Sequence, residues 1–278
     1  MNRDAVMLWS AVALYGLGLA LTVPSTWRRR PTLTRGTLGA LAAGLTLHFG
    51  FLVSRAAEIH RLPITDVRSA LSSFTFLATL AFFLVYLRYR IGALGLFMLP
   101  LVFLLTLLSA LRAGKTFESP AFRSGWLVVH IGSILIGYVG FFLTFVAALM
   151  YLIRSSELKS KNLGAFYFRL PPLDACDQLY YRSLILGLPF LSLGIIMGFV
   201  YASRTWTGPW ELDPKILASM VTWLIYLVLF ATRLGGTWGG RRSAAMAIFG
   251  FAAVLATFLG ISLWSGLHGY FPKLGGSP

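Results

Sequence analysis

The sequence predicts an all-α membrane protein, a bundle of about eight transmembrane helices, from three features. Hydrophobic residues make up 57% of the 278 positions, and charged residues only 12%. The mean hydropathy of +0.76 is well above that of soluble domains. Eight apolar runs approach the roughly 20 residues that cross a bilayer. Because unpaired backbone groups are costly in hydrocarbon, we expect each run to be a helix.

The predicted helices follow one another closely along the chain. In order, the runs cover residues 6–23, 37–54, 70–87, 91–111, 126–153, 184–203, 216–232 and 244–264. A basic residue follows each of the first seven runs: Arg28, Arg55, Arg88, Arg112, Arg154, Arg204 and Arg233. The fifth run is longer than the hydrocarbon is thick, so we expect it to tilt or project. Residues 154–183 are expected to form a loop along the interface.

The charge distribution predicts the orientation of the chain. The segments on one side of the runs hold 14 Lys and Arg residues, beginning with Arg28–Arg30, and those on the other side hold 10. The side with more basic residues is expected in the cytoplasm. Both termini then lie outside, together with loops near 55–69, 112–125 and 204–215.

Composition also narrows the partners and the chemistry. The formal charge of +15 is spread over short segments between apolar runs, which favours lipid headgroups over nucleic acid as partners. Cys176 is the only cysteine, so no internal disulfide or CxxC pair exists. The sequence has no nucleotide-binding loop and no HExxH, GxSxG or CxxCH motif. No composition shift marks a second domain, and we expect a single domain over 1–278.

Two of the four histidines lie on the same predicted outer side. His130 is at the outer end of run 126–153, and His268 lies just beyond the eighth run. Between them, the outer loop at 204–215 contains Trp206 and Trp210. Two imidazoles can supply both axial ligands of a heme iron, and tryptophan rings can cover a porphyrin face. Alternatively, these residues form an ordinary interfacial belt; the residues alone leave both interpretations open.

The same loop contains charged residues with two possible roles. Asp213 followed by Pro214 is typical of a helix start, with Asp as N-cap and Pro as the first helical residue. Arg204 and Lys215 can pair with the two heme propionates. As an alternative, both cations reach toward lipid headgroups.

His48 differs from the other histidines because it lies inside the second apolar run. A polar group there is costly and often belongs to a pathway or site. It can ligate a heme transiently within the bilayer, or it can form an interhelical hydrogen bond to a Ser or Thr. We leave both roles open, and we expect His60, in the outer loop, to be solvated.

Nine fragments, in order along most of the chain, give a family resemblance. They are Glu58–Thr65, Leu127–His130 followed by Gly137 and Tyr138, Leu158–Lys161, Arg169–Pro172, Leu193–Gly198, Trp206–Lys215, Thr232–Leu234, Trp238–Arg242 and Gly266–Tyr270. With these fragments the chain resembles the cytochrome c assembly family, which includes CcsA, ResC and the shorter HemX-like proteins. The resemblance implies a tryptophan-rich "WWD" platform that presents heme b outside, with His130 and His268 as axial ligands.

Three positions depart from the family pattern. Leu212 replaces the third tryptophan of the loop, and Ile216 replaces a glutamate after Lys215. Ala231 stands where the family has an intramembrane histidine that holds heme on its way out. These departures put heme translocation and full synthase activity in question. His48 is a candidate substitute for the missing ligand.

The resemblance implies a CcsA-type protein of cytochrome c biogenesis in the bacterial inner membrane, a component of a holocytochrome c synthase. It would present heme for attachment to the CxxCH cysteines of apocytochrome c. A membrane partner with a periplasmic domain (CcsB/ResB-like), or a larger complex, would assist. The alternatives are a HemX-like accessory subunit without ligation activity, which the degenerate loop favours, and a permanent b-type electron-transfer subunit.

Overall fold

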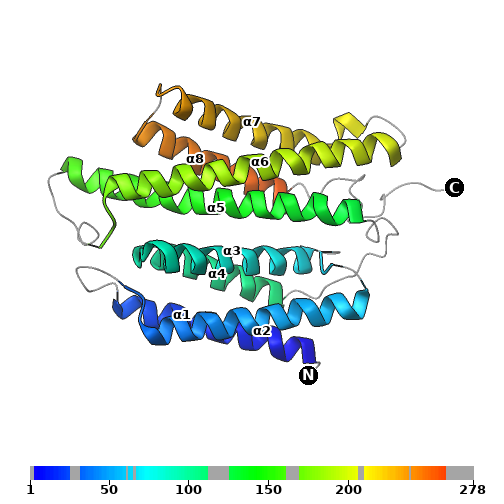
Figure 1. Cartoon of the computed structure of the whole chain (residues 1–278), viewed down its shortest axis with the longest axis horizontal. Helices are drawn as coiled ribbons and strands as arrows, with labels where there is room; N and C mark the ends of the chain where they lie inside the picture. Colours follow the sequence, from blue (N-terminus) through cyan, green and yellow to red (C-terminus); the bar gives the residue numbers. More distant parts are fainter. Residues whose placement is uncertain are drawn as a thin grey trace. The chain divides into compact units, whose positions relative to one another are not determined.

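The regular elements of the chain are helical throughout the part that the structure describes. The computed structural model describes residues 3–25, 32–60, 62–64, 67–111, 125–160, 169–205, 210–237 and 239–260. The helices within these ranges are α1 (Arg3–Ser25), α2 (Arg35–Ile59), α3 (Val67–Tyr89), α4 (Ala93–Leu111), α5 (Gly125–Ser160), α6 (Leu173–Thr205), η2 (Trp210–Leu212), α7 (Pro214–Leu234), α8 (Arg241–Leu255) and η3 (Ala256–Gly260) (Figure 1).

Eight of the described helices are long and apolar enough to cross a membrane. Six of them contain a predicted run completely, and α4 begins two residues after the start of run 91–111. The eighth run, 244–264, begins in α8 and continues through η3, and its residues 261–264 lie outside the described residues. The prediction of an all-α membrane fold with eight transmembrane helices is therefore confirmed. The chain is a multi-pass membrane protein.

The prediction of a loop over residues 154–183 is wrong at both of its ends. Helix α5 continues to Ser160, and α6 begins at Leu173. Pro172 immediately precedes α6, and its carbonyl accepts hydrogen bonds from the backbone amides of Ala175 and Cys176 in the first turn, at 3.0 and 3.2 Å. Hydropathy identifies only the apolar stretch of a helix, so polar turns that extend it are missed.

The chain divides into two compact units. Unit 1 comprises residues 1–118 and 149–179, and unit 2 comprises residues 119–148 and 180–278. The division falls within α5 and α6, each of which contributes to both units. The single domain expected from composition stays a prediction.

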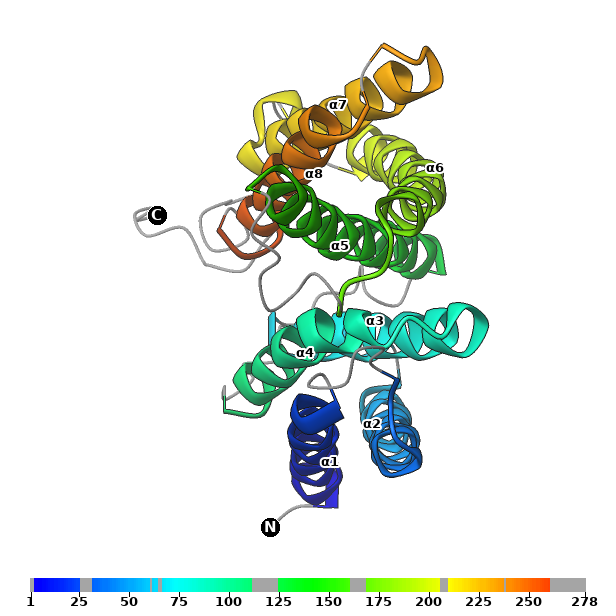
Figure 2. The same cartoon turned by 90° about the vertical axis from the view of Figure 1, so that its left-hand side faces the viewer.

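Unit 1 contains α1 to α4. Helix α1 packs against α2 and α4, and α3 packs against α4 and α2 (Figure 2). Tyr15 of α1 is fully buried against Gly44 of α2, where an added Cβ would lie 2.7 Å from the Tyr15 ring. Gly44 therefore allows the two helices to approach closely around the ring.

His48 of α2 forms a buried polar cluster with side chains of α1 and α3. Its Nε2 lies 2.8 Å from the Ser72 hydroxyl of α3, and its Nδ1 lies 3.3 Å from the Tyr15 hydroxyl of α1. All three side chains are fully buried. The interhelical hydrogen bond to a serine, one of the two roles expected for His48, is therefore present. A transient heme contact at His48 stays a hypothesis.

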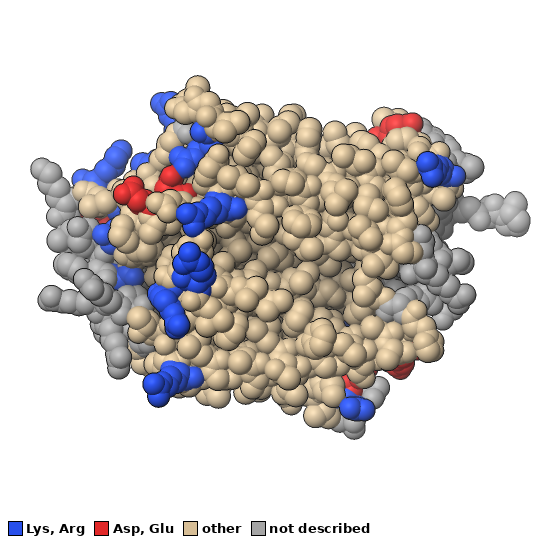
Figure 3. Space-filling model, in the orientation of Figure 1, with Lys and Arg blue, Asp and Glu red and all other residues tan. Residues whose placement is uncertain are grey.

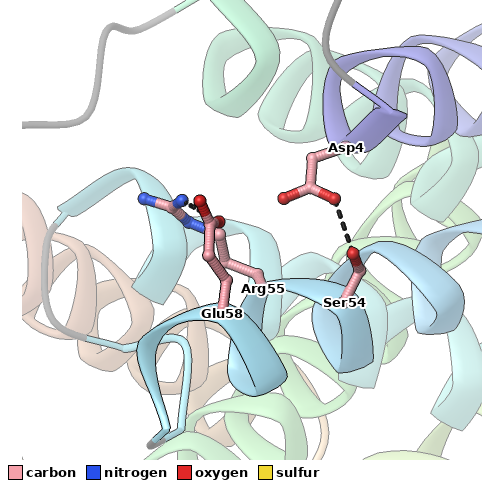
Figure 4. A network of polar contacts seen from close by, with 4 residues as sticks. All are labelled: Asp4, Ser54, Arg55 and Glu58. Atoms are coloured by element: carbon pink, nitrogen blue, oxygen red, sulfur yellow. Dashed lines mark hydrogen bonds and ion pairs between the residues drawn. The ribbon is translucent and has the colours of Figure 1, made fainter.

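One polar contact joins α1 and α2 where α1 begins and α2 ends, and an ion pair lies next to it within α2 (Figure 4). The Ser54 hydroxyl donates to Asp4 at 2.7 Å, and Arg55 forms an ion pair with Glu58 at 2.6 Å. An exposed ion pair such as Arg55–Glu58 contributes little to stability.

His60 caps the end of α2 in the left-handed conformation, with φ of 52°, and its side chain is exposed as expected.

Unit 2 contains α7, α8 and the adjoining parts of α5 and α6. An added Cβ at Gly140 of α5 would lie 2.7 Å from the Cα of Gly187 on α6, so the two backbones nearly touch. The Trp223 indole of α7 donates to Ser192 of α6 at 2.9 Å. The Phe141 and Tyr226 rings stack face to face with centroids 3.6 Å apart. These contacts tie α5, α6 and α7 together.

Charged side chains follow the pattern expected for a lipid-embedded protein. The middle of the visible face in Figure 3 carries almost no charged side chains, and Lys and Arg gather toward its two ends. Arg233, in the last turn of α7, lies over the rings of Tyr180 and Tyr181, at 5.3 and 5.4 Å from their centroids. Exposed apolar residues such as Leu224 and Phe249 are suited to contact lipid tails.

Candidate functional site

The structure describes six of the eight residues predicted to bind heme. Five of them belong to unit 2: His130, Arg204, Trp210, Asp213 and Lys215. The sixth is His48, which belongs to unit 1 and whose contacts are given above. The remaining two residues, Trp206 and His268, lie outside the described residues.

His130 lies in the second turn of α5 and is held against α6. Its Nδ1 is 2.7 Å from the backbone carbonyl oxygen of Gly194. A carbonyl oxygen only accepts hydrogen bonds, so Nδ1 carries the proton and donates. In the neutral ring, the lone pair is then on Nε2. A histidine that donates through one nitrogen to a carbonyl is a common form of metal-ligating imidazole.

Gly198 provides the space in which the His130 ring lies. An added Cβ at this position would be 2.7 Å from Cε1 of the imidazole and 3.2 Å from Nδ1. Gly194, one turn earlier on α6, is just as close to α5, with Ile134 Cγ1 at 2.6 Å from an added Cβ. The pair of glycines allows the imidazole to pack directly on the α6 backbone.

Trp126 belongs to the same arrangement and was missed from the sequence. Its indole nitrogen donates to the carbonyl oxygen of Met197 at 2.9 Å. It lies four residues before His130, and that spacing puts both side chains on one face of α5. Trp126 is 42% exposed, so part of its surface stays open. The four-residue spacing from His130 was the signal in the sequence.

Trp210 packs on α6 next to this site. Its ring lies 5.8 Å from that of Phe199, which immediately follows Gly198 on α6. Trp210 begins the short helix η2, which packs against α7, and its carbonyl accepts from the Asp213 amide at 3.1 Å. An indole of the tryptophan-rich loop is thus fixed by the helix that also holds His130. Phe199 was not predicted, because nothing in its local sequence distinguishes it.

Asp213 is the N-cap of α7, as predicted. One of its carboxylate oxygens accepts from the backbone amides of Lys215 and Ile216, at 2.9 and 3.2 Å, and Pro214 is the first residue of the helix. The Asp213 side chain is buried. Its place in the loop is therefore explained by helix capping, which fixes where η2 ends and α7 starts.

Two cations lie at this end of unit 2. Arg204 is exposed in the last turn of α6, and Lys215 is partly buried in the first turn of α7. Lys and Arg are the residues that pair with carboxylates such as propionates. An imidazole with its lone pair on Nε2, aromatic rings and cations together suit the iron, the porphyrin face and the propionates of heme.

The three departures from the family pattern lie in different surroundings. Leu212 is 68% exposed in η2, and Ile216 is partly buried in the first turn of α7. Ala231 is exposed on α7, three residues after Val228 and seven after Leu224, which are also exposed. Because this spacing repeats on one helix face, position 231 lies on an outward apolar face of α7.

Comparisons with known proteins place the whole chain in a family. The family model described as "Cytochrome C assembly protein" matches residues 37–268. The chain is similar to the cytochrome c biogenesis protein CcsA of Gloeobacter violaceus, with 27% identity over 97% of this chain and 94% of the relative. It is also similar to CcsA of Mesostigma viride (26% identity; 97% and 95% covered) and of Guillardia theta (28%; 79% and 80%).

The matched region includes every residue of the site and ends at His268. The family resemblance inferred from scattered fragments is thus confirmed by similarity over most of the sequence. The chain belongs to the cytochrome c assembly protein family.

Proposed function

We propose that this chain is a CcsA-type heme-handling protein of cytochrome c biogenesis. It holds heme b at the outer face of the membrane for attachment to apocytochrome c. Family membership and similarity to CcsA over nearly the whole chain support this function. The observation that carries it is the hydrogen bond from His130 Nδ1 to the Gly194 carbonyl, which in the neutral ring puts the lone pair suited to an iron ligand on Nε2.

Each residue of the site has a role in this function. His130 and His268 supply the axial imidazoles, and Trp206 and Trp210 cover the porphyrin. Arg204 and Lys215 pair with the propionates. Heme supplies the vinyl groups that form thioether bonds with cysteine thiols. This chain's only cysteine, Cys176, is buried, so the thiols belong to the apocytochrome.

The proposed topology places the site on the outer side of the cytoplasmic membrane of a bacterium. The greater number of Lys and Arg residues on the opposite side supports this orientation. Eight crossings, an even number, would return the chain to the side where it began, so both termini lie outside.

The proposed partners follow from the chemistry that the chain lacks. A CcsB/ResB-like membrane protein with a periplasmic domain, or a larger complex, would complete a holocytochrome c synthase, and apocytochrome c would supply the acceptor thiols. Membrane lipids surround the helices. We keep His48 as a candidate for a transient heme contact. It is a weaker candidate than His130, because both of its ring nitrogens already contact hydroxyl groups.

A HemX-like accessory role is the second candidate function. In this role the chain binds heme or a partner complex without taking part in ligation. The exposed Leu212 in place of a tryptophan and the outward-facing Ala231 in place of a histidine favour it. The two candidate functions share the heme site and differ in what happens to the bound heme.

Heme binding is tested by the absorption spectrum of the protein purified from heme-replete cells. We expect a Soret band that is strongly reduced in His130→Ala and in His268→Ala. His60→Ala is the matched control, because His60 is exposed at the end of α2 and is not one of the residues proposed to bind heme. An unchanged Soret band in either site variant would overturn the proposal.

Ligation is tested separately, in cells that lack their own CcsA-type protein. If the chain restores covalently attached cytochrome c, measured by heme staining of denaturing gels, the CcsA-type function holds. Bound heme without any restoration would refute the synthase role and leave the accessory role.

A further inference from the structure

We infer that Gly198 and Trp126 are positioning residues that set the protonation pattern and the direction of the His130 imidazole. This inference rests on the proposed function for its consequence, but its geometry stands on contacts within unit 2. Neither residue needs to touch heme. Both act through the contacts that pack α5 against α6.

The two side chains of α5 form matching contacts with α6. Trp126 and His130, four residues apart, donate to the carbonyl oxygens of Met197 and Gly194, three residues apart. The two donors are one helical turn apart on α5, and the two acceptors are about one turn apart on α6. Paired contacts of this kind fix the rotation of α5 at the site and the direction in which the imidazole leaves the helix.

The second part of the arrangement is the missing side chain at position 198. A β-carbon there would approach Cε1 of His130 to 2.7 Å, well inside the ordinary contact distance of carbon atoms. Nδ1 and Nε2, which flank this ring carbon, would lie 3.2 and 3.6 Å from the added Cβ, so the ring as a whole would have to move away. The hydrogen bond to the Gly194 carbonyl would then be lengthened or lost.

This arrangement has a direct chemical consequence. Donation from Nδ1 to a carbonyl selects the neutral tautomer whose lone pair is on Nε2, and it also raises the basicity of that nitrogen. Loss of such an outer contact typically weakens metal binding by roughly 10–100-fold. We therefore expect Gly198→Ala to weaken heme binding by roughly that factor while leaving His130 in place.

The first test uses the heme-free protein in detergent micelles with ¹⁵N-labelled histidine. The four histidines of the chain are assigned by single substitutions. We expect the ¹⁵N shifts of His130 to show a protonated Nδ1 and an unprotonated Nε2. A His130 protonated on Nε2, or exchanging equally between the tautomers, would overturn the inference without reference to heme.

The second test compares two glycine substitutions in the same unit. Gly198→Ala should shift the ¹⁵N signals of His130 toward those of an exchanging imidazole and weaken heme binding. Gly132→Ala on α5 is the matched control, because an added Cβ there has no atom within 4 Å among the described residues. Both changes favour helix formation, so a general loss of helix stability cannot explain a difference.

A third variant separates positioning from packing. Trp126→Phe keeps an aromatic ring but removes the N–H that bonds to Met197. We expect weaker heme binding that is partly restored by millimolar imidazole, which can replace a displaced ligand. If Gly198→Ala and Trp126→Phe bind heme as tightly as the Gly132→Ala control, the inference is refuted. If His130→Ala itself keeps its heme, the proposed function fails instead.

Discussion

Substitution of Ser72 by alanine should destabilise unit 1 by breaking the His48 contact. The change removes one hydroxyl and leaves almost no cavity, so the cost should reflect the hydrogen bond of 2.8 Å. Hydrogen bonds between helices in membranes contribute about 0.6 kcal/mol on average and up to about 1.7 kcal/mol. We expect a value in the upper half of this range, because Ser72 and His48 are both fully buried.

The double-mutant cycle with His48→Ala isolates this contact. His48→Ala alone removes a buried ring and both of its hydroxyl contacts, and should cost roughly 2–5 kcal/mol, as large-to-small core substitutions do. In that background Ser72→Ala should cost close to nothing, because its partner has gone. The assay is the free energy of unfolding in mixed micelles, measured by titration with a denaturing detergent.

Thr46→Ala is the control for this cycle. Thr46 is exposed on α2, and its hydroxyl donates to Ala42 within the same helix, so little stability should be lost. If Ser72→Ala is as neutral as Thr46→Ala, the structural role of His48 is wrong. Loss of the heme spectrum in His48→Ala, with unchanged stability, would instead assign His48 to heme.

Three further predictions concern unit 2. Gly187→Ala should cost roughly 1–3 kcal/mol of unfolding free energy, because the added Cβ lies 2.8 Å from the Phe141 ring; equal stability to wild type would contradict the close packing of α5 and α6. Asp213→Ala should cost about 1 kcal/mol through the lost N-cap, whereas Asp213→Asn should stay near wild type; equal losses would argue against capping. Tyr226→Phe should raise the unfolding temperature, since the buried Tyr226 hydroxyl has no hydrogen-bond partner among the described residues; a lower temperature would reveal an unseen partner.

The helices themselves could be predicted because hydrocarbon imposes one simple requirement on the sequence. A long apolar run must pair its backbone internally, and this gave every transmembrane helix of the described part. The start of α7 was also predictable, because Asp213 and Pro214 act through local contacts. The polar start of α6 at Leu173 was not, because its hydropathy resembles that of a loop.

The candidate site was only partly predictable, because the contacts that hold His130 depend on how α5 and α6 pack. Local sequence pointed to His130 and Trp210 as candidates. The contribution of Gly198 appears only once the two helices are placed side by side, since a glycine is defined by what it makes room for. The donor role of Trp126 likewise depends on a carbonyl 71 residues away.

The most direct test of the central claim is the resonance Raman spectrum of the ferric heme in the purified protein and in His130→Gly. If His130 is an axial ligand, the wild type gives six-coordinate low-spin heme, and His130→Gly gives five-coordinate or high-spin heme. Added imidazole should then return the variant to the wild-type pattern. A low-spin spectrum in His130→Gly that is identical to wild type without imidazole would contradict the account.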